Sequence, residues 1–443
     1  MSTPPASELP ADRLLELDRR HVWHPFTQEA TAPLPVPVVA GSGAVLRGAD
    51  GREYLDLIAS WWVNLHGHAH PAIAEAIAAQ ARCLEQVIFA GFTHAPAVEL
   101  ARRLTSLLPG DLDRVFYSDD GSTAVEVALK IAVQYWRNRG ARRERFIAFE
   151  GGYHGDTFGA MSAGRGSGFF GPFEGMLLPV DQVPFPATWE GDPEVEAREA
   201  AALAALDDLL ERSGDATAAI ILEPLVQGAG GMRMCRPGFV AEVVRRARAR
   251  GVLVIFDEVM TGFGRTGSLF ACLGVGVTPD LVCLSKGLTG GFLPLSATVV
   301  REPIYQGFLD PEFDKAFAHG HSFTANPLGC AAALASLDLL LEPSTQARIR
   351  AIEARHRELV AALEDIPRAT RGRVTGTIAA LDVAAGESGY TAAVAQRLKA
   401  WFLDAGLLIR PLGPTVYLMP PYCVTDAQLD RAYAGIREAL AGL

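Results

Sequence analysis

Short apolar runs alternate with longer helical patterns through the middle of the chain, and this alternation constrains the fold more than any other feature. The runs are four or five residues long and rich in valine, isoleucine and leucine, which favours strands over helices. Strands that are apolar along their whole length are typical of a parallel sheet covered by helices on both faces. The pattern therefore predicts an α/β fold with a mostly parallel sheet, whose strands are expected at residues 114–117, 146–149, 219–222, 252–256, 281–284 and 296–300.

The character of the sequence changes after about residue 327. Two helical patterns, at residues 329–341 and 345–363, lead into a strand-rich stretch at residues 374–383. A chain of 443 residues exceeds one average domain, so a second, smaller α+β domain is expected. We therefore expect an N-terminal segment that joins the small domain, then the large domain, then the C-terminal small domain, at residues 1–58, 59–330 and 331–443.

Three local patterns add detail to this outline. The pair Asp50-Gly51 stands between alternating residues and predicts a β-hairpin with a tight turn. Residues 181–199 are rich in proline and acidic residues and are expected to form a surface excursion. Adjacent tryptophans in a strand face opposite sides, so of Trp61 and Trp62 one is expected to pack while the other lines a pocket.

Composition and charge exclude several classes of protein. The formal net charge of -11 argues against a nucleic-acid partner, because phosphate binding needs a basic surface. No apolar run approaches the roughly 20 residues needed to span a bilayer, and the first ten residues lack the features of a secretory signal. The six cysteines are scattered without a CxxC pair, which indicates a reduced, cytoplasmic protein without a zinc site.

A carboxylate and a lysine follow two neighbouring predicted strands. Asp257 comes directly after the strand at 252–256, and Lys286 follows the next strand, 29 positions further on. The carboxyl ends of buried parallel strands are where open α/β sheets bind ligands. Pyridoxal 5'-phosphate requires a lysine that forms an imine and a carboxylate that keeps the pyridine nitrogen protonated. The pair therefore predicts a pyridoxal-phosphate site.

Two further loops supply groups that such a site needs. Gly121-Ser122 opens a predicted helix, whose free N–H groups and positive dipole end suit a phosphate. Tyr153, in a glycine-framed loop after another strand, could stack on a flat ring. Each residue also has an ordinary explanation: a helix cap at Asp119 or Asp120, an ion pair, a surface lysine or simple packing. Because all of them fall at the same edge of one predicted sheet, the functional interpretation is preferred.

Residues 256–267, read as Phe-Asp-Glu-Val-Met-Thr-Gly-Phe-Gly-Arg-Thr-Gly and followed by Lys286, resemble the signature of the class III aminotransferases. The resemblance covers nearly the whole chain. It implies a pyridoxal-phosphate-dependent transferase of fold type I and a homodimer whose two active sites lie at the subunit interface. It also implies roles for individual residues, which fall into three groups.

The catalytic group consists of Lys286, which carries the cofactor as a Schiff base and moves a proton, with Asp257 and Tyr153. The cofactor-binding group adds to these the phosphate-binding residues, a side chain near the phenolic oxygen and two residues from the partner subunit, namely Gly121, Ser122, Gln227, His321 and Ser322. The substrate-binding group consists of Phe26, Trp61, Tyr153, Gly320, Arg410 and Tyr417, with Arg410 on the substrate carboxylate.

Within the class, the chain most resembles enzymes of biotin synthesis that move an amino group from S-adenosylmethionine to 8-amino-7-oxononanoate, giving 7,8-diaminononanoate. The stretches that carry this resemblance include 23–25, 60–62, 93–96, 152–157, 226–231, 319–320, 326–328, 409–413 and 417–422. Phe26 replaces the usual tyrosine and Gly320-His321-Ser322 replaces Gly-Pro-Thr, as in a branch of these enzymes that uses lysine. Lysine is therefore the alternative donor.

Other functions fit the sequence less well. Another class III enzyme, acting on an ω-amino acid or a diamine, would differ only in its acceptor, and Arg410 with the two tryptophans favours 8-amino-7-oxononanoate. A non-catalytic aminotransferase-like module would usually accompany a DNA-binding domain, for which the chain has no room. An NAD-dependent oxidoreductase needs a GxGxxG motif opening a helix after the first strand, which the sequence lacks.

Overall fold

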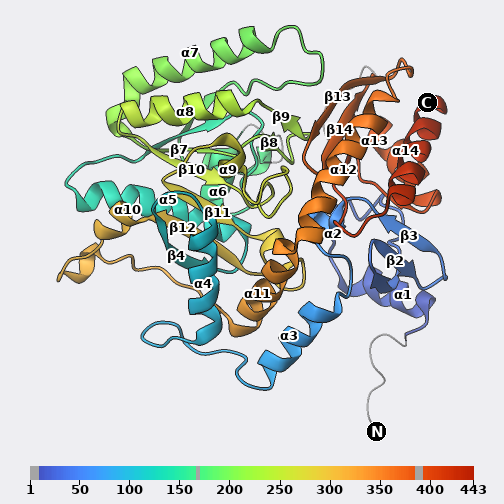
Figure 1. The fold of residues 1–443 in the computed structure, drawn as a ribbon, viewed down its shortest axis with the longest axis horizontal. Coiled ribbons are helices and arrows are strands. Elements are labelled where there is room, and N and C mark those ends of the chain that lie inside the picture. The colour runs from blue at the N-terminus through green and yellow to red at the C-terminus, as the bar shows by residue number, and fades with distance from the viewer. Residues whose placement is uncertain (1–8, 166–169, 385–392) are drawn as a thin grey trace.

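The computed structural model describes residues 9–165, 170–384 and 393–443 (Figure 1). Its centre is a seven-stranded sheet with the strand order β4-β12-β11-β10-β7-β5-β6. All six strands expected from the sequence belong to this sheet. In chain order its strands are β4 (Leu112–Ser118), β5 (Arg145–Phe149), β6 (Val180–Val183), β7 (Thr217–Leu222), β10 (Leu253–Asp257), β11 (Leu281–Leu284) and β12 (Ser296–Arg301).

The sheet is mostly parallel, as the sequence predicts. Strands β11, β10, β7, β5 and β6 pair in parallel, whereas β12 runs antiparallel to both of its neighbours, β11 and β4. Consequently the carboxyl ends of the parallel strands meet at one edge, which is where the candidate site lies.

Helices bury both faces of this sheet. In β10 the side chains of Leu253 and Ile255 belong to the same apolar cluster as helix α5 (Gly121–Asn138). The alternate residues Val254 and Phe256 belong to the other cluster, with Val240 of helix α8 (Pro237–Ala249). Because successive strand residues point to opposite faces, a strand covered on both sides must be apolar throughout. The remaining helices of this part are α3 (Pro71–Ala81), α4 (Ala95–Leu107), α6 (Phe158–Ala163), α7 (Val195–Ser213), α9 (Ala271–Val275) and α10 (Glu302–Gln306).

One sequence prediction for this region is wrong. Residues 181–199 do not form a single surface excursion, because β6 is an edge strand and α7 begins at Val195. The strand contains Asp181 and Gln182, and among the described strands it pairs with β5 alone. An edge strand with polar residues lacks the apolar run that marks the inner strands, which is why the sequence pattern misses it.

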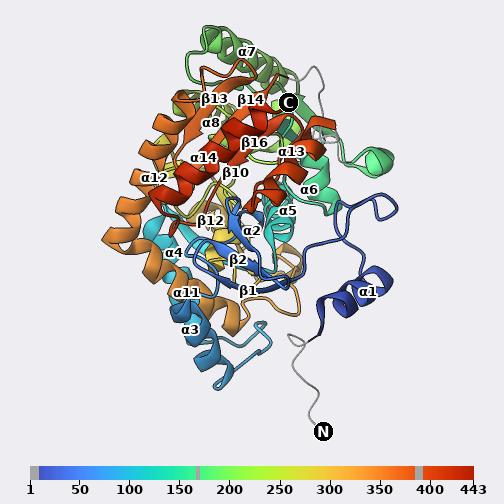
Figure 2. The same cartoon turned by 90° about the vertical axis from the view of Figure 1, so that its right-hand side faces the viewer.

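The C-terminal part packs beside the N-terminal strands (Figures 1 and 2). Strand β15 (Leu407–Leu408) adds in parallel to β3 (Glu53–Asp56), so residues about 350 positions apart share one sheet. The predicted hairpin around Asp50-Gly51 is confirmed by antiparallel pairing of β2 with β3. The other elements of these two parts are α1 (Ala11–His21), β1 (Val38–Ser42), β2 (Val45–Gly48), α2 (Ala59–Trp62), α11 (Pro327–Leu341), α12 (Pro343–Ala361), β13 (Ala369–Thr375), β14 (Ile378–Val383), α13 (Ala393–Asp404), β16 (Thr415–Leu418) and α14 (Asp426–Ala441).

The domain boundaries at residues 58 and 330 stay predictions, and residues 1–8 of the N-terminal segment lie outside the described residues. A short hairpin of β8 (Val226–Gln227) and β9 (Arg233–Met234) lies beside the main sheet. Among the described residues, none of the helices combines the length and the apolar character that crossing a membrane requires.

Candidate active site

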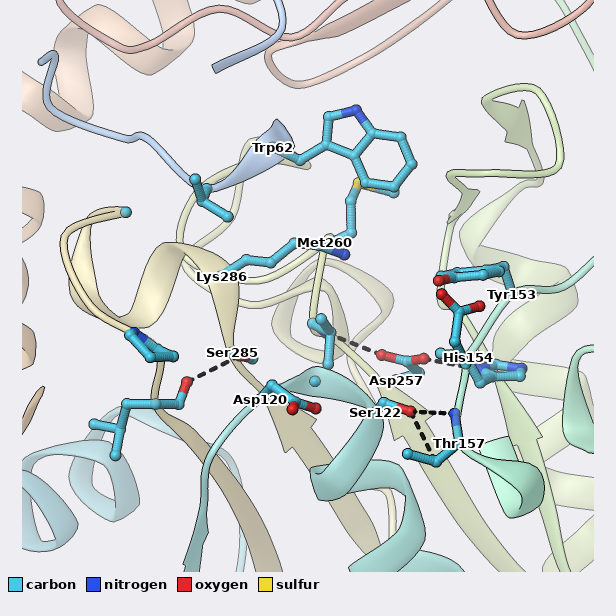
Figure 3. Close-up of a pocket in the computed structure, with 18 of the residues that line it drawn as sticks. Trp62, Asp120, Ser122, Tyr153, His154, Thr157, Asp257, Met260, Ser285 and Lys286 are labelled. Atoms are coloured by element: carbon cyan, nitrogen blue, oxygen red, sulfur yellow. Dashed lines mark hydrogen bonds and ion pairs between the residues drawn. The ribbon is translucent and has the colours of Figure 1, made fainter. Parts of the chain in front are cut away.

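Four neighbouring strands deliver polar side chains to one cavity of about 690 Å³ (Figure 3). Along the sheet order β11-β10-β7-β5, the residues that lie at or after these strand ends and line the cavity are Lys286, Asp257, Glu223 and the pair Tyr153-His154. The predicted convergence of Lys286, Asp257 and Tyr153 is therefore seen in the structure. The other lining residues discussed below are Trp62, Asp120, Gly121, Ser122, Gly155, Asp156 and Thr157.

Lys286 begins a short turn directly after β11, with a φ of 46°. Its Nζ atom lies 4.9 Å from the centre of the Trp62 ring. Burial lowers the pKa of Lys286 from its ordinary value, while the carboxylates of Asp257 and Glu223 oppose that change. A lysine with a lowered pKa is more readily neutral, as imine formation and proton abstraction both require.

Asp257 ends β10 and is held from two sides. Its Oδ2 atom lies 2.7 Å from Nδ1 of His154, and its Oδ1 atom accepts a hydrogen bond from the backbone N–H of Val259. Burial is the largest influence on the pKa of His154 and lowers it, but the hydrogen bond to Asp257 and the charges of Asp257 and Glu223 together outweigh burial, so the pKa is raised. His154 thus orients the Asp257 carboxylate, a role that the sequence analysis did not assign.

Glu223 follows β7 and is, beside Asp257, a second buried carboxylate of the cavity that the sequence analysis missed. Only 5% of its surface is exposed. Its Oε2 atom accepts a hydrogen bond from the backbone N–H of Tyr153, and its Oε1 atom accepts one from Gly228. A clue was present in the sequence, because Glu223 comes directly after a predicted strand, as Asp257 does.

The N-terminus of helix α5 forms another wall of the cavity. Asp120 caps the helix by accepting a hydrogen bond from the backbone N–H of Thr123, so the helix-cap interpretation holds. Gly121 and Ser122 nevertheless line the cavity, and Ser122 Oγ lies 2.7 Å from Thr157 Oγ1. The residues therefore combine a cap with a helix dipole whose positive end faces the cavity.

A second cavity of about 340 Å³ shares Trp62, Tyr153, Asp156 and Lys286 with the first. It extends to Arg410, whose guanidinium carbon lies 5.0 Å from the centre of the Trp61 ring. Its remaining lining residues are Phe26, Trp61, Ala229, Leu412 and Tyr417. The structure thus brings together most of the residues predicted to bind substrate.

Trp61 and Trp62 do not lie in a strand, so the expected reason for their different environments is wrong. They belong to α2, a short kinked turn in which Ser60 and Trp62 have positive φ angles. Both tryptophans line the second cavity, and Trp62 also lines the first. The Trp62 indole N–H donates a hydrogen bond of 2.9 Å to the hydroxyl of Tyr417, which fixes the ring beside Lys286.

Four predicted residues lie outside the linings of both cavities. Gln227 is buried, and its Oε1 atom has no hydrogen-bond partner among the described residues. Gly320 and Ser322 are exposed, and His321 Nδ1 lies 3.4 Å from Asp119 Oδ2. The roles assigned to these four residues stay predictions.

The sequence and the fold both match known proteins. The sequence model of the aminotransferase class-III family matches residues 26–440, so the chain belongs to the class III aminotransferases. It is a pyridoxal-phosphate-dependent aminotransferase of fold type I.

Curated relatives carry a more particular name. A protein of Synechococcus elongatus named adenosylmethionine-8-amino-7-oxononanoate aminotransferase is 56% identical to this chain, covering 95% of this chain and 98% of the relative. A protein of the same name from Nitratidesulfovibrio vulgaris is 41% identical, covering 99% of this chain and 83% of the relative.

Solved structures agree on the fold. An enzyme of that name from Methanocaldococcus jannaschii has a TM-score of 0.90 at 32% identity, covering 97% of this chain and 99% of the other. An (S)-enantioselective omega-transaminase from Thermomicrobium roseum has a TM-score of 0.89 at 31% identity, covering 98% of both chains. A pyridoxal-phosphate-bound amine transaminase from an uncultivated Pseudomonas species has a TM-score of 0.88 at 31% identity, covering 95% of this chain and 98% of the other.

The residues of the larger cavity fit pyridoxal 5'-phosphate. A carboxylate, a lysine with a lowered pKa and a helix N-terminus line one space, and these suit the pyridine nitrogen, the aldehyde and the phosphate. The phosphate end is open because Gly155 lacks a side chain: a Cβ atom there would lie 2.8 Å from the Cα of Ser122. When bound, this cofactor withdraws electrons from the carbon that carries the amino group.

Proposed function

We propose that this aminotransferase moves an amino group from S-adenosylmethionine to 8-amino-7-oxononanoate, which gives 7,8-diaminononanoate for biotin synthesis. The observation that carries this proposal is the second cavity, which joins Lys286 to Arg410 through aromatic and apolar walls. The acceptor has the same order of groups: a ketone at the reacting end, an alkyl chain, and a carboxylate at the far end.

Arg410 would bind the carboxylate of the acceptor. A guanidinium can pair with both oxygens of a carboxylate, and the ring of Trp61 fixes its plane from one side. Tyr417 and Trp62 would form the wall along the alkyl chain, since their rings meet edge to face with centroids 6.3 Å apart. These two rings would keep water away from the acceptor's alkyl chain, and Lys286 would lie at the reacting end.

Lys286 would act as the base that moves a proton during both halves of the reaction. Its lowered pKa favours the neutral amine, and Trp62 limits its contact with water. Asp257 would pair with the pyridine nitrogen, with its position fixed by His154. Gly121 and Ser122 would hold the phosphate and Tyr153 would stack on the ring.

The aromatic entrance fits the adenosine part of S-adenosylmethionine. Phe26 meets Trp61 edge to face at 5.8 Å and is 44% exposed, so an aromatic surface faces the opening of the cavity. Phe26 offers a ring for stacking but no hydroxyl. For this reason lysine is the second candidate donor.

We also propose a homodimer in which Gly320, His321 and Ser322 serve the partner's site. Gly320 and Ser322 are exposed in one chain, and His321 lies beside Asp119 next to the phosphate wall. The cytoplasmic location expected from the sequence stays a prediction. Cross-linking and sedimentation would test the dimer, and a monomer with full activity would contradict it.

The decisive experiment incubates the purified, cofactor-loaded protein with 8-amino-7-oxononanoate and either S-adenosylmethionine or L-lysine, and quantifies 7,8-diaminononanoate by mass spectrometry. Product with S-adenosylmethionine supports the proposal. Product with lysine alone would move the donor to the second candidate. The absence of product from both donors, with the lysine-bound cofactor band intact, would refute the proposed acceptor.

A further inference from the structure

Glu223 lies among the charged groups that line the active-site cavity, yet the roles given above leave it without a function. The strand order places it between Asp257, which ends β10, and the loop after β5 that carries Tyr153 and His154. It is nearly completely buried and lines the larger cavity. A buried carboxylate is costly unless its charge is used or well compensated.

Two backbone N–H groups hold the carboxylate in place. One belongs to Tyr153, 3.0 Å from Oε2, and the other to Gly228, 2.9 Å from Oε1. Tyr153 follows β5 and Gly228 follows β8, so Glu223 links two loops that border the site. Bonds from N–H groups to a carboxylate are stronger than those between neutral groups.

The same carboxylate acts electrostatically on the proton-carrying groups around it. It favours the protonated form of Lys286 and the protonated form of His154. Burial raises the pKa of Glu223 itself to about 7, although the neighbouring His154 opposes this rise. Near neutral pH its charge therefore depends on its neighbours.

We propose that Glu223 is a positioning residue that supplies the second buried carboxylate of the cofactor site, beside Asp257, and, by linking two loops, fixes the backbone of Tyr153. With the cofactor bound, its charge would favour a proton at Nζ of Lys286. Through its two hydrogen bonds it holds the ring-stacking residue in register. This inference depends on the cofactor alone, so it is independent of the proposed donor and acceptor.

Two substitutions separate the charge from the link between the loops. Glu223→Gln keeps the size of the side chain and removes the charge. Glu223→Asp keeps the charge, but the side chain is one methylene shorter and cannot reach both N–H groups. The readout is the pH midpoint of the absorbance band of the lysine-bound cofactor, measured without substrates, together with the Kd for pyridoxal phosphate.

Glu258→Gln is the matched control. Glu258 is also buried, accepts hydrogen bonds from two backbone N–H groups, those of Ala271 and Cys272, and has a pKa raised to about 7 by burial. It differs from Glu223 because it does not line the cavity. Its substitution should lower the midpoint of thermal unfolding and leave the pH midpoint of the absorbance band unchanged.

Glu223→Gln should lower the pH midpoint of the band by about 1 unit, since a nearby opposite charge stabilises the protonated form by that order. Glu223→Asp should leave the midpoint close to that of the native enzyme and raise the Kd for pyridoxal phosphate several-fold. An unchanged midpoint in Glu223→Gln, or an equal shift in Glu258→Gln, would overturn the proposal. If Glu223→Gln does not fold, a large midpoint shift in Glu223→Asp would overturn it as well.

Discussion

The Nδ1 atom of His154 lies 2.7 Å from the Oδ2 atom of Asp257, and both side chains are buried beneath the cavity that holds Lys286. In this arrangement the imidazole and the carboxylate compensate each other's charge. The pair thereby orients the Asp257 carboxylate and offsets the cost of burying both polar side chains. The ability of the site to bind a protonated pyridine nitrogen depends on this pair.

Replacing His154 with phenylalanine should reduce kcat/KM by roughly 10- to 100-fold, because it removes a hydrogen bond to a charged group. The Kd for pyridoxal phosphate should rise as well. His356→Phe is a suitable control, since His356 is also buried and its Nδ1 lies 2.8 Å from the hydroxyl of Tyr433, away from the cavity. It should destabilise the fold without changing cofactor affinity; equal effects of the two variants on affinity would contradict the assignment.

Replacing Lys286 with alanine should lower turnover by at least about 100-fold, because both the imine-forming amine and the proton-transferring base are lost. Borohydride reduction should then no longer attach the cofactor to the protein, which mass spectrometry of the intact chain would show. Lys315→Ala, which removes a surface ion pair with Asp310, should behave like the native enzyme. Turnover near the native rate in Lys286→Ala would disprove the catalytic assignment.

The sequence was sufficient to predict the mostly parallel sheet and the meeting of Lys286 with Asp257. Inner strands are apolar on both faces, and their ends share one edge, so position along the chain translates into position in space. Glu223 follows a strand in the same way, but its place beside Asp257 depends on the order β10-β7-β5. That order comes from long-range pairing, which local patterns do not encode.

The sequence also could not predict in which direction a side chain points in an irregular turn. Trp62 points toward Lys286 because α2 is kinked, and that kink is held by Asp56, whose carboxylate accepts hydrogen bonds from Ile58 and Ser60. The alternation of side chains along a strand, which was assumed for the two tryptophans, does not apply to backbone with positive φ angles. The expectation that one of the two adjacent tryptophans packs while the other lines a pocket is therefore wrong, because both line the second cavity.

Replacing Arg410 with glutamine should raise the KM for the keto-acid acceptor and lower kcat/KM by roughly 10- to 100-fold, as expected for loss of a charge-assisted hydrogen bond. The half-reaction with the donor should change far less, and stopped-flow absorbance with donor alone would measure it. Arg142→Gln, on an exposed loop, is the control. If the donor half-reaction suffers as much as the acceptor half-reaction, Arg410 does not recognise the acceptor's carboxylate.

Glu223→Gln should also change how the stability of the cofactor-free protein depends on pH. The pKa of Glu223 is raised to about 7, from an ordinary value of 4.5, so its favourable contribution is complete below pH 4.5 and is lost as the pH rises through 7. Glutamine does not titrate. The free energy of unfolding of the native protein relative to the variant should therefore fall by about 2 kcal/mol between pH 5 and pH 8.

Urea unfolding at a series of pH values would measure this difference between Glu223→Gln and the native protein. Glu16→Gln, at an exposed site on α1, serves as the control and should leave the pH dependence unchanged. A difference between Glu223→Gln and the native protein that stays constant with pH would show that Glu223 does not gain a proton on folding.

Replacing Gly155 with alanine should weaken cofactor binding at the phosphate end. Gly155 has a φ of +125°, and an added Cβ would lie 2.8 Å from the Cα of Ser122, so the start of α5 must move. Gly140→Ala is the control that separates backbone strain from the steric clash with Ser122. Gly140 also has a positive φ, +76°, but open space around it. Both variants carry backbone strain, whereas only Gly155→Ala displaces Ser122.

The Kd for pyridoxal phosphate should rise about 10-fold or more in Gly155→Ala and stay near the native value in Gly140→Ala. Fluorescence titration of the cofactor-free protein would measure both values, and an unchanged Kd in Gly155→Ala would place the phosphate away from Ser122.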